Sequence, residues 1–149
     1  MLISMDITLE YLKYEDLKAY KSILDDVLGE SQSLEHFQTY YKRDHASVKI
    51  VVAKKDDVII GTITFTLIDT FTSPLDPKIE FSNFATSLSA RGTPTAKRLM
   101  NFVFDYAKEH GYQSIAVNCL TDALRAHRFY EKMGFEKIDR ARFMMKVEH

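Results

Sequence analysis

The stretch NFATSLSARGTPTAKRL, residues 83–99, decides the fold, because an apolar strand here runs through an Arg-Gly turn into a helix. Thr93 is a good helix N-cap, and Pro94 suits the first helical position, where its missing N–H costs nothing. Three backbone amides are then expected to point outward without partners: those of Thr95, Ala96 and Lys97. Such amides, together with the positive end of the helix dipole, attract a phosphate or pyrophosphate group.

Two small residues in this turn fit the same interpretation. Gly92 removes a Cβ where the backbone must come close to a ligand, and the small Ala96 serves the same end. The structural alternative is an ordinary strand-to-helix turn with a Thr-Pro cap. A second segment, AHRFYEKMGF at residues 126–135, favours the phosphate-binding interpretation.

Together the two segments resemble the GCN5-related N-acetyltransferase (GNAT) superfamily. Its first motif, Arg/Gln-x-x-Gly-x-Gly/Ala, binds the pyrophosphate of acetyl-coenzyme A, and its second forms a helix ending in Tyr-x-x-x-Gly-Phe. Arg91 and Ala96 match the first and last key positions, whereas Pro94 replaces the usual middle glycine and removes one possible amide donor. An asparagine often found before the second motif is also missing, since Ala123 stands seven residues before Tyr130.

The resemblance implies an α/β (α+β) fold of the acyl-CoA N-acyltransferase type, as one domain over residues 1–149. It implies a mixed, mostly antiparallel sheet of about 6–7 strands with about four helices. In that fold the pantetheine arm pairs with exposed strand backbone, here at Phe84, Ala85 and Thr86. The other implied cofactor-binding residues are Arg91, Gly92, Thr93, Thr95, Ala96, Lys97, His127 and Arg128.

Hydrophobic periodicity predicts the elements directly. Strands are expected over residues 7–12, 48–53, 58–67, 79–86, 114–120 and 142–147. Helices are expected over 17–28, from 33 to about 41, over 94–111 and over 122–133. The strands on either side of the helix at 94–111 are expected to be a parallel pair with a right-handed crossover, and ligands of such units bind beyond the carboxyl ends of the strands.

Composition limits the classes of protein. The chain has 149 residues, of which 46% are apolar and 28% charged, as in an ordinary soluble domain. The net charge of −1 and the lack of a long basic run argue against a nucleic-acid partner. Residues 1–6 do not resemble a signal peptide and no stretch suits a membrane span, so we expect a cytoplasmic protein without a membrane partner.

Cysteine content agrees with that location. The single cysteine, Cys119, cannot form an internal disulfide, as expected in a reducing compartment. No Cys/His cluster has metal-ligand spacing, so no metal is expected. Cys119 as an acyl-carrying nucleophile is the alternative to direct transfer, and a small buried thiol at a strand end is its structural interpretation.

Acetyl transfer to an amine needs a proton acceptor, an oxyanion donor and an acid for the departing thiolate. The resemblance implies the backbone N–H of Phe84 as oxyanion donor and Tyr130 as acid, whose phenol is protonated at pH 7. Alternatively, Phe129 and Tyr130 are core aromatic residues before Gly134.

The base is expected to be Glu80, acting through a water. Strict alternation places Glu80, Ser82, Phe84 and Thr86 on one face of their strand. Ser82 occupies the position where relatives often carry a carboxylate, and a solvated strand carboxylate is the alternative role of Glu80. His127 is of the residue type that serves as a base at neutral pH, but a helix histidine beside Arg128 suits a surface or cofactor-contact position.

The acceptor in this family is shaped by the first two helices, their connection and the late strands, which here include residues 28–33 and 71–77. Acidic residues in the first region favour a cationic amine, with a solvated helix face as the alternative: Asp25, Asp26, Glu30 and Glu35. We therefore expect direct transfer from acetyl-CoA to a small primary amine, such as an amino acid or a polyamine, in a ternary complex. A non-catalytic acyl-CoA-binding module, a peptide or protein acceptor, and a homodimer stay open.

Overall fold

The computed structural model describes residues 6–43 and 45–149. The chain forms two compact units, Met1–Val117 and Asn118–His149. The expectation about a signal peptide falls on residues 1–5, which lie outside the described part. Within that part, no helix is long and apolar enough to cross a membrane.

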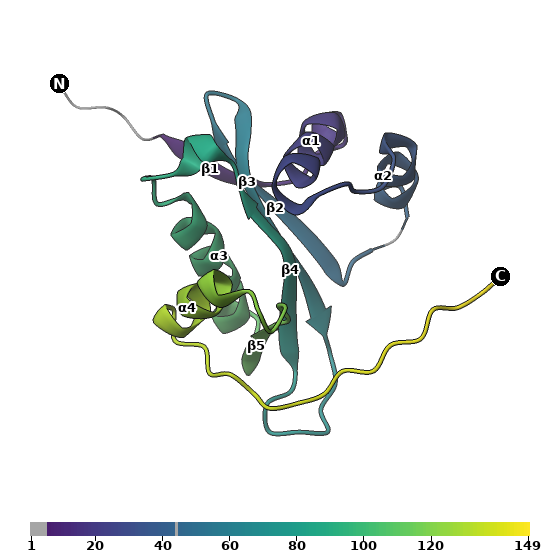
Figure 1. Ribbon diagram of the computed structural model, residues 1–149, viewed down its shortest axis with the longest axis vertical. Coiled ribbons are helices and arrows are strands. Elements are labelled where there is room, and N and C mark those ends of the chain that lie inside the picture. The colour runs from purple at the N-terminus through teal and green to yellow at the C-terminus, as the bar shows by residue number, and fades with distance from the viewer. Residues whose placement is uncertain (1–5, 44) are drawn as a thin grey trace. The chain divides into compact units, whose positions relative to one another are not determined.

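A five-stranded sheet forms the centre of the first unit, in the order β1-β2-β3-β4-β5 (Figure 1). Neighbours are antiparallel from β1 to β4, and β5 runs parallel to β4. The strands are β1 (Ile7–Tyr11), β2 (Val48–Lys55), β3 (Val58–Ile68), β4 (Lys78–Thr86) and β5 (Ser114–Val117). This mixed, mostly antiparallel sheet confirms the predicted fold class and the parallel pair around the third helix.

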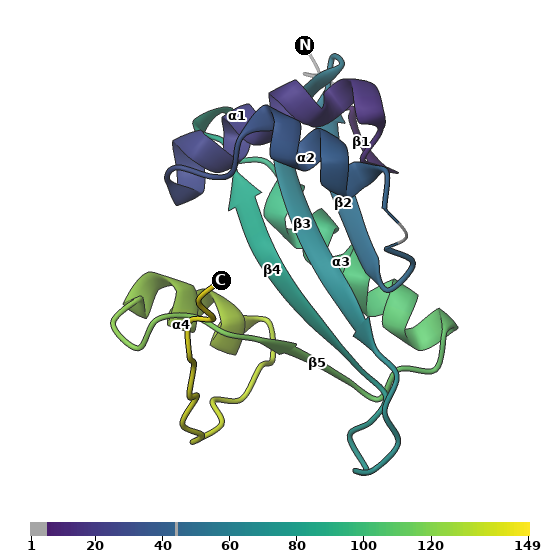
Figure 2. The same ribbon diagram turned by 90° about the vertical axis from the view of Figure 1, so that its right-hand side faces the viewer.

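Helices cover both faces of this sheet (Figure 2). On one face lie α1 (Leu17–Leu28) and α2 (Leu34–Tyr41), and on the other lies α3 (Thr95–Glu109). The short 3-10 helices η1 (Tyr14–Asp16) and η2 (Leu88–Ala90) precede α1 and α3. Caps bound the first two helices: α1 ends at Gly29, with φ of 93°, and at the start of α2 the Ser33 hydroxyl accepts a hydrogen bond from the His36 amide at 3.1 Å.

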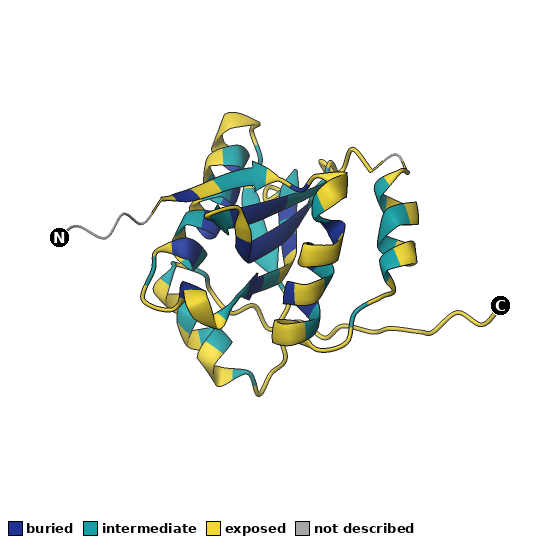
Figure 3. Cartoon of the chain, turned by 90° about the horizontal axis from the view of Figure 1, so that it is seen from above, coloured by how far each residue is buried: buried dark blue, intermediate teal, exposed yellow. Residues whose placement is uncertain are grey.

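The core of this unit lies on both faces of the sheet (Figure 3). On the α1 side, Tyr20, Ile23 and Leu24 pack with Val52 and Ile59. From α3 the side chains of Leu99, Met100 and Val103 are fully buried. The helical and strand periodicities of the sequence therefore predict which faces turn inward.

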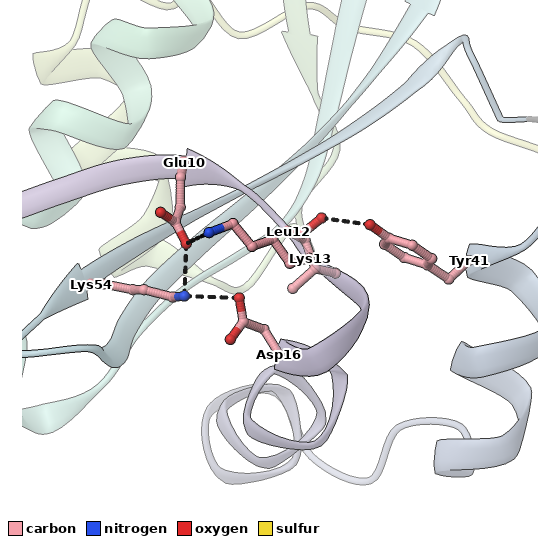
Figure 4. Close-up of polar contacts among 6 residues, drawn as sticks. All are labelled: Glu10, Leu12, Lys13, Asp16, Tyr41 and Lys54. Atoms are coloured by element: carbon pink, nitrogen blue, oxygen red, sulfur yellow. Dashed lines mark hydrogen bonds and ion pairs between the residues drawn. The ribbon is translucent and has the colours of Figure 1, made fainter.

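Polar contacts fix the start of α1 and the position of α2 (Figure 4). The Lys54 ammonium on β2 forms ion pairs with Glu10 at 2.7 Å and Asp16 at 2.8 Å. These carboxylates raise the pKa of Lys54, and Lys54 in turn lowers the pKa of Glu10. The Tyr41 hydroxyl at the end of α2 donates to the Leu12 carbonyl at 3.2 Å.

The second unit contains α4 (Leu124–Lys132). After this helix, residues 134–149 form neither helix nor strand, and apolar side chains such as Phe143 and Met144 are about nine-tenths exposed. The predicted strand over 142–147 is therefore wrong, and the described residues form five strands instead of 6–7. Alternation reports only which side chains could share a face, whereas a strand also needs a neighbour to accept and donate its backbone hydrogen bonds.

Candidate active site

A β-bulge interrupts β4 near its carboxyl end. Thr62 on β3 faces Ala85, and Thr64 faces Ser82, so a single β3 residue opposes both Asn83 and Phe84. Asn83 has φ of 47°, in the left-handed region that asparagine tolerates better than most residues. Such bulges bend a strand and re-aim its side chains, and they are frequent beside active sites.

The bulge changes the geometry expected for the base. Glu80 lies before it, half-buried between Thr66 of β3 and Ala116 of β5. Ser82 is exposed immediately before it, and Thr86 follows it. The strict alternation that placed these residues on one face with Phe84 is therefore interrupted.

The ladder between β4 and β5 stops early. Its last pair is Phe81 with Val117, while β4 continues to Thr86 (Figure 2). The backbone expected to pair with pantetheine, Phe84 to Thr86, thus extends past the end of this parallel ladder. Diverging parallel strands of this kind leave space beyond the carboxyl end of the shorter one.

The turn from β4 into α3 differs in detail from the prediction. The helix begins at Thr95, and Pro94 is the N-cap residue, one position later than expected. Thr93 still provides a capping oxygen, because its hydroxyl accepts the Thr95 amide at 3.3 Å. Gly92 has φ of 76°, and a Cβ at this position would meet no neighbouring atom. Glycine is therefore favoured here by the left-handed backbone conformation and not by lack of space.

The cradle therefore offers two of the three predicted amides. Thr95 is already paired through its amide and is fully buried, with its hydroxyl 2.6 Å from that of Thr93. The amide of Arg98 donates to the Pro94 carbonyl at 2.8 Å. The amides of Ala96 and Lys97 precede this helical hydrogen bond and remain the candidate phosphate donors.

Gly61 on β3 holds the start of α3 close to the sheet. A Cβ at this position would lie 2.9 Å from Cγ2 of Thr95 and 3.0 Å from Cδ1 of Leu99. Only glycine allows that approach without a shift of these side chains or of the helix that carries them. Our sequence prediction missed Gly61, although a glycine inside a β-rich run is a recognised sign of close backbone approach.

A pocket of about 400 Å³ opens beside the bulge. Its walls come from the end of α1, the α1–α2 loop, α2 and β4: Leu24, Glu30, Ser31, Gln32, Phe37 and Asn83. Three of these residues belong to the loop 28–33 that was expected to shape the acceptor site. The other expected segment, residues 71–77, joins β3 to β4 and does not line this pocket.

Asn83 is the pocket residue that sequence reasoning missed. Asparagine is depleted in strands, and Asn83 interrupts a β-rich run. That mismatch is the signal of an irregular strand position. The same residue thus forms the bulge and lines the pocket.

In the second unit, the candidate acid Tyr130 is half-buried on α4. Burial, with a smaller contribution from Cys119, raises the pKa of its phenol, which keeps the proton on the oxygen at neutral pH. The ring makes edge contacts with Phe129 at 5.6 Å and Phe135 at 5.7 Å between centroids. Tyr130 is therefore both a packed aromatic residue and a protonated phenol.

The neighbouring candidates have different environments. His127 Nε2 lies 2.8 Å from the Leu120 carbonyl oxygen, while Arg128 and Arg91 are exposed. Cys119 is exposed, so the expectation of a buried thiol is wrong: β5 ends at Val117, before the cysteine. Among the described residues, no group of three His, Cys, Asp or Glu side chains is placed to hold a metal ion.

Comparison with known proteins agrees with this architecture. The mixed sheet ends in the parallel strands β4 and β5, whose pairing stops before β4 leads to the start of α3. This arrangement is that of the acyl-CoA N-acyltransferase fold. The model of the acetyltransferase (GNAT) family matches residues 14–135. The chain therefore belongs to the GNAT acetyltransferase family and is an N-acetyltransferase by class. No curated protein matches the sequence.

Solved structures share the fold at low sequence identity. A transcriptional regulator from Bacillus halodurans C-125 is 23% identical, with a TM-score of 0.80 over 94% of this chain and 99% of the other. AAC(6')-Iy in complex with the bisubstrate analogue CoA-S-monomethyl-acetylneamine is 17% identical, with a TM-score of 0.78 over 95% and 98%. A ribosomal-protein-alanine N-acetyltransferase from Brucella melitensis biovar Abortus 2308 is 15% identical, with a TM-score of 0.73 over 95% and 99%.

Proposed function

We propose that this chain transfers the acetyl group of acetyl-CoA directly to the primary amine of a small molecule while both substrates are bound. The observation that carries the proposal is the bulge at Asn83 and Phe84. It forms part of the pocket wall and lies on the strand that leads through η2 to the start of α3. One short segment of backbone thus connects a place for the acceptor with a place for the donor.

The donor would be held mainly by backbone groups. The amides of Ala96 and Lys97 would bind the pyrophosphate at the positive end of α3, with Arg91, Gly92 and Thr93 shaping the turn. The strand backbone from Phe84 to Thr86 would pair with the pantetheine arm. His127 and Arg128 are further candidate contacts, proposed from the resemblance of their helix to the second family motif.

The chemistry assigns one task to each candidate residue. Glu80 would accept the ammonium proton through a water, since a protonated amine cannot attack. The amine nitrogen then forms a bond to the thioester carbonyl carbon, and the Phe84 amide stabilises the oxyanion. When the carbon–sulfur bond breaks, Tyr130 would give its proton to the departing thiolate of coenzyme A. The nitrogen loses its second proton to solvent as the amide forms, and Tyr130 regains a proton from solvent.

The protonation state of Tyr130 supports this assignment. Its pKa is raised by burial, so the phenol carries its proton at neutral pH, and an acid must do so. The family match runs from residue 14 to residue 135 and so crosses from the first unit into the second. This supports one N-acetyltransferase domain to which α4 contributes the acid.

The location is part of the proposal. The chain has a single cysteine, so it needs no disulfide, which suits a reducing cytoplasmic compartment. Acetyl-CoA and a small amine are the proposed partners.

A thiol-release assay tests the proposed function. Purified protein is incubated with acetyl-CoA and a panel of small amines, amino acids and peptides, and free coenzyme A is measured with a chromogenic disulfide. We expect release that depends on a small amine and falls strongly in Tyr130→Phe. Release with peptides but no small amine would overturn the acceptor class, and acetyl-CoA binding without release would indicate a non-catalytic module.

A further inference from the structure

The pocket beside the bulge has an uneven chemical character. Leu24, which is buried, and Phe37, which is half-buried, contribute apolar side chains. The other lining residues contribute a carboxylate, a hydroxyl and two amides, from Glu30, Ser31, Gln32 and Asn83. Among the described residues that line it, Glu30 carries the charge, and that charge is negative.

A neighbouring ion pair holds the loop that carries Glu30. The Asp25 carboxylate, one turn from the end of α1, accepts the Ser31 amide at 2.8 Å and the Ser31 hydroxyl. Its other oxygen lies 2.6 Å from the Lys21 ammonium. Hydrogen bonds from Lys21 and Ser31 lower the pKa of Asp25 to about 2, so this carboxylate stays ionised at neutral pH.

These contacts decide which pocket groups are available to a ligand. The Ser31 hydroxyl already donates to Asp25, and the Asp25 charge is paired with Lys21. Neither Asp25 nor Lys21 lines the pocket, whereas Glu30 and Asn83 do. The remaining recognition groups are thus one carboxylate, the amides of Gln32 and Asn83, and the Ser31 hydroxyl as an acceptor, beside the apolar Leu24 and Phe37.

The groups that line the pocket should distinguish small amines by their second functional group. A second ammonium group would pair with Glu30 while the methylenes between the two nitrogens cover Leu24 and Phe37. A carboxylate at the same place would meet a like charge without a basic residue lining the pocket. An uncharged alkyl end would leave the exposed Glu30 carboxylate to water and would gain no ion pair from it.

We propose that the acceptor is an aliphatic diamine or polyamine whose non-reacting ammonium binds Glu30. The inference rests on the proposed function, because it places the reacting amine at the bulge end of the same pocket. One nitrogen loses its proton and is acetylated, while the other keeps its proton and its ion pair. The enzyme thereby selects a dication over an amino acid.

Three linear amines of similar length test this selection: 1,4-diaminobutane, butylamine and 4-aminobutanoate. We expect kcat/KM to be highest for the diamine and lowest for the amino acid. Glu30→Gln should raise the KM for the diamine by about 5- to 10-fold, between the effects of an exposed ion pair and of a hydrogen bond to a charged group. The values for butylamine should stay within about twofold, because a monoamine has no ammonium for Glu30 to hold.

A matched variant and a charge reversal sharpen the test. Glu109→Gln removes an exposed carboxylate at the end of α3 that does not line the pocket, and it should leave the kinetics of all three amines unchanged. Glu30→Lys should lower kcat/KM for the diamine and raise it for 4-aminobutanoate. Melting temperatures of all variants show whether they are folded.

A binding measurement separates this proposal from the proposed function. Calorimetry with coenzyme A already bound reports diamine affinity without turnover. Glu30-dependent diamine binding without thiol release would overturn the transferase and support the recognition of a dication. Thiol release with equal kcat/KM for diamine and monoamine in the wild type, or a diamine KM that Glu30→Gln leaves unchanged, would overturn the diamine as acceptor and leave the transferase.

Discussion

The turn at the start of α3 and the pocket beside α1 recognise their proposed ligands in different ways. The turn offers backbone amides of Ala96 and Lys97, set by Gly92 at φ of 76° and by the close approach over Gly61. The pocket offers side chains, of which Glu30 is charged. Side-chain identity should therefore matter little for donor binding except where it blocks the turn, whereas acceptor choice should change with single side chains. β4 connects the two regions through its bulge.

The largest effect is expected from Ala96→Glu, which puts bulk and a negative charge where the pyrophosphate would bind. Like charges at an interface cost several kcal/mol, so acetyl-CoA affinity should fall about 100- to 1,000-fold. Isothermal titration calorimetry measures this loss, and acetyl-CoA should no longer raise the melting temperature. Pro94→Gly is the matched control, since it restores an amide donor and should keep or improve binding. An Ala96→Glu variant that binds as tightly as the wild type would show that the cradle is elsewhere.

The second-largest effect is expected from removal of the candidate general acid, the Tyr130 hydroxyl. Tyr130→Phe should lower kcat about 10- to 1,000-fold and barely change acetyl-CoA affinity, because only proton transfer to the thiolate is lost. Steady-state kinetics and calorimetry on the same preparation separate the two quantities. Phe129→Leu is a control for the aromatic packing and should mainly lower the melting temperature. If Tyr130→Phe loses stability but keeps its turnover per folded molecule, the residue is structural.

Gly61→Ala should test whether the turn depends on close packing. The added Cβ would lie 2.9 Å from Thr95, and overpacking of this kind typically costs about 1–3 kcal/mol. We expect a lower melting temperature and a weaker acetyl-CoA complex, because the start of α3 must shift. Gly92→Ala is the contrasting variant: space around it is open, so its cost should come only from the left-handed backbone conformation, about 1–2 kcal/mol. Equal acetyl-CoA affinity in Gly61→Ala and wild type would contradict this dependence.

Sequence patterns predicted the regular elements of the first unit well, because strands and helices that bury one face carry apolar residues at a regular spacing. Leu99, Met100 and Val103 recur at helical spacing and are fully buried. The failure at residues 142–147 has a physical cause: their alternation resembles that of a strand, yet pairing depends on a neighbour that local pattern does not specify.

The site was predicted less completely than the fold. The Arg-Gly turn and the acidic loop were visible as local motifs. The bulge at Asn83 was not, because it depends on how many β4 residues oppose one residue of β3. The hydrogen bond from the Thr95 amide to the Thr93 hydroxyl was also not predicted. An amide in the first turn of a helix has no partner within the helix, but a nearby hydroxyl can accept its hydrogen bond.

A smaller effect is expected from Asp25→Asn, which loosens the loop that carries Glu30. The pKa of Asp25 is lowered from 3.8 to about 2, so its contribution to stability is present above pH 3.8 and lost as the pH falls through about 2. The difference in melting temperature between wild type and variant should be constant from pH 5 to 8 and shrink below pH 4. The KM for diamines should rise while acetyl-CoA affinity stays unchanged. Asp26→Asn, an exposed neighbour, serves as control, and a gap that widens in acid would contradict the assigned role.

The smallest effect is expected from Cys119→Ala, and it belongs to the measurement that tests direct transfer most closely. Initial rates are recorded with acetyl-CoA and 1,4-diaminobutane both varied, and intact-protein mass spectrometry follows the enzyme with acetyl-CoA alone. Direct transfer should give intersecting double-reciprocal lines, no acetylated protein, and a Cys119→Ala variant that keeps most of its activity. Parallel lines, an acetyl group on Cys119 and an inactive alanine variant would contradict it, because they are the signs of a covalent acetyl-enzyme.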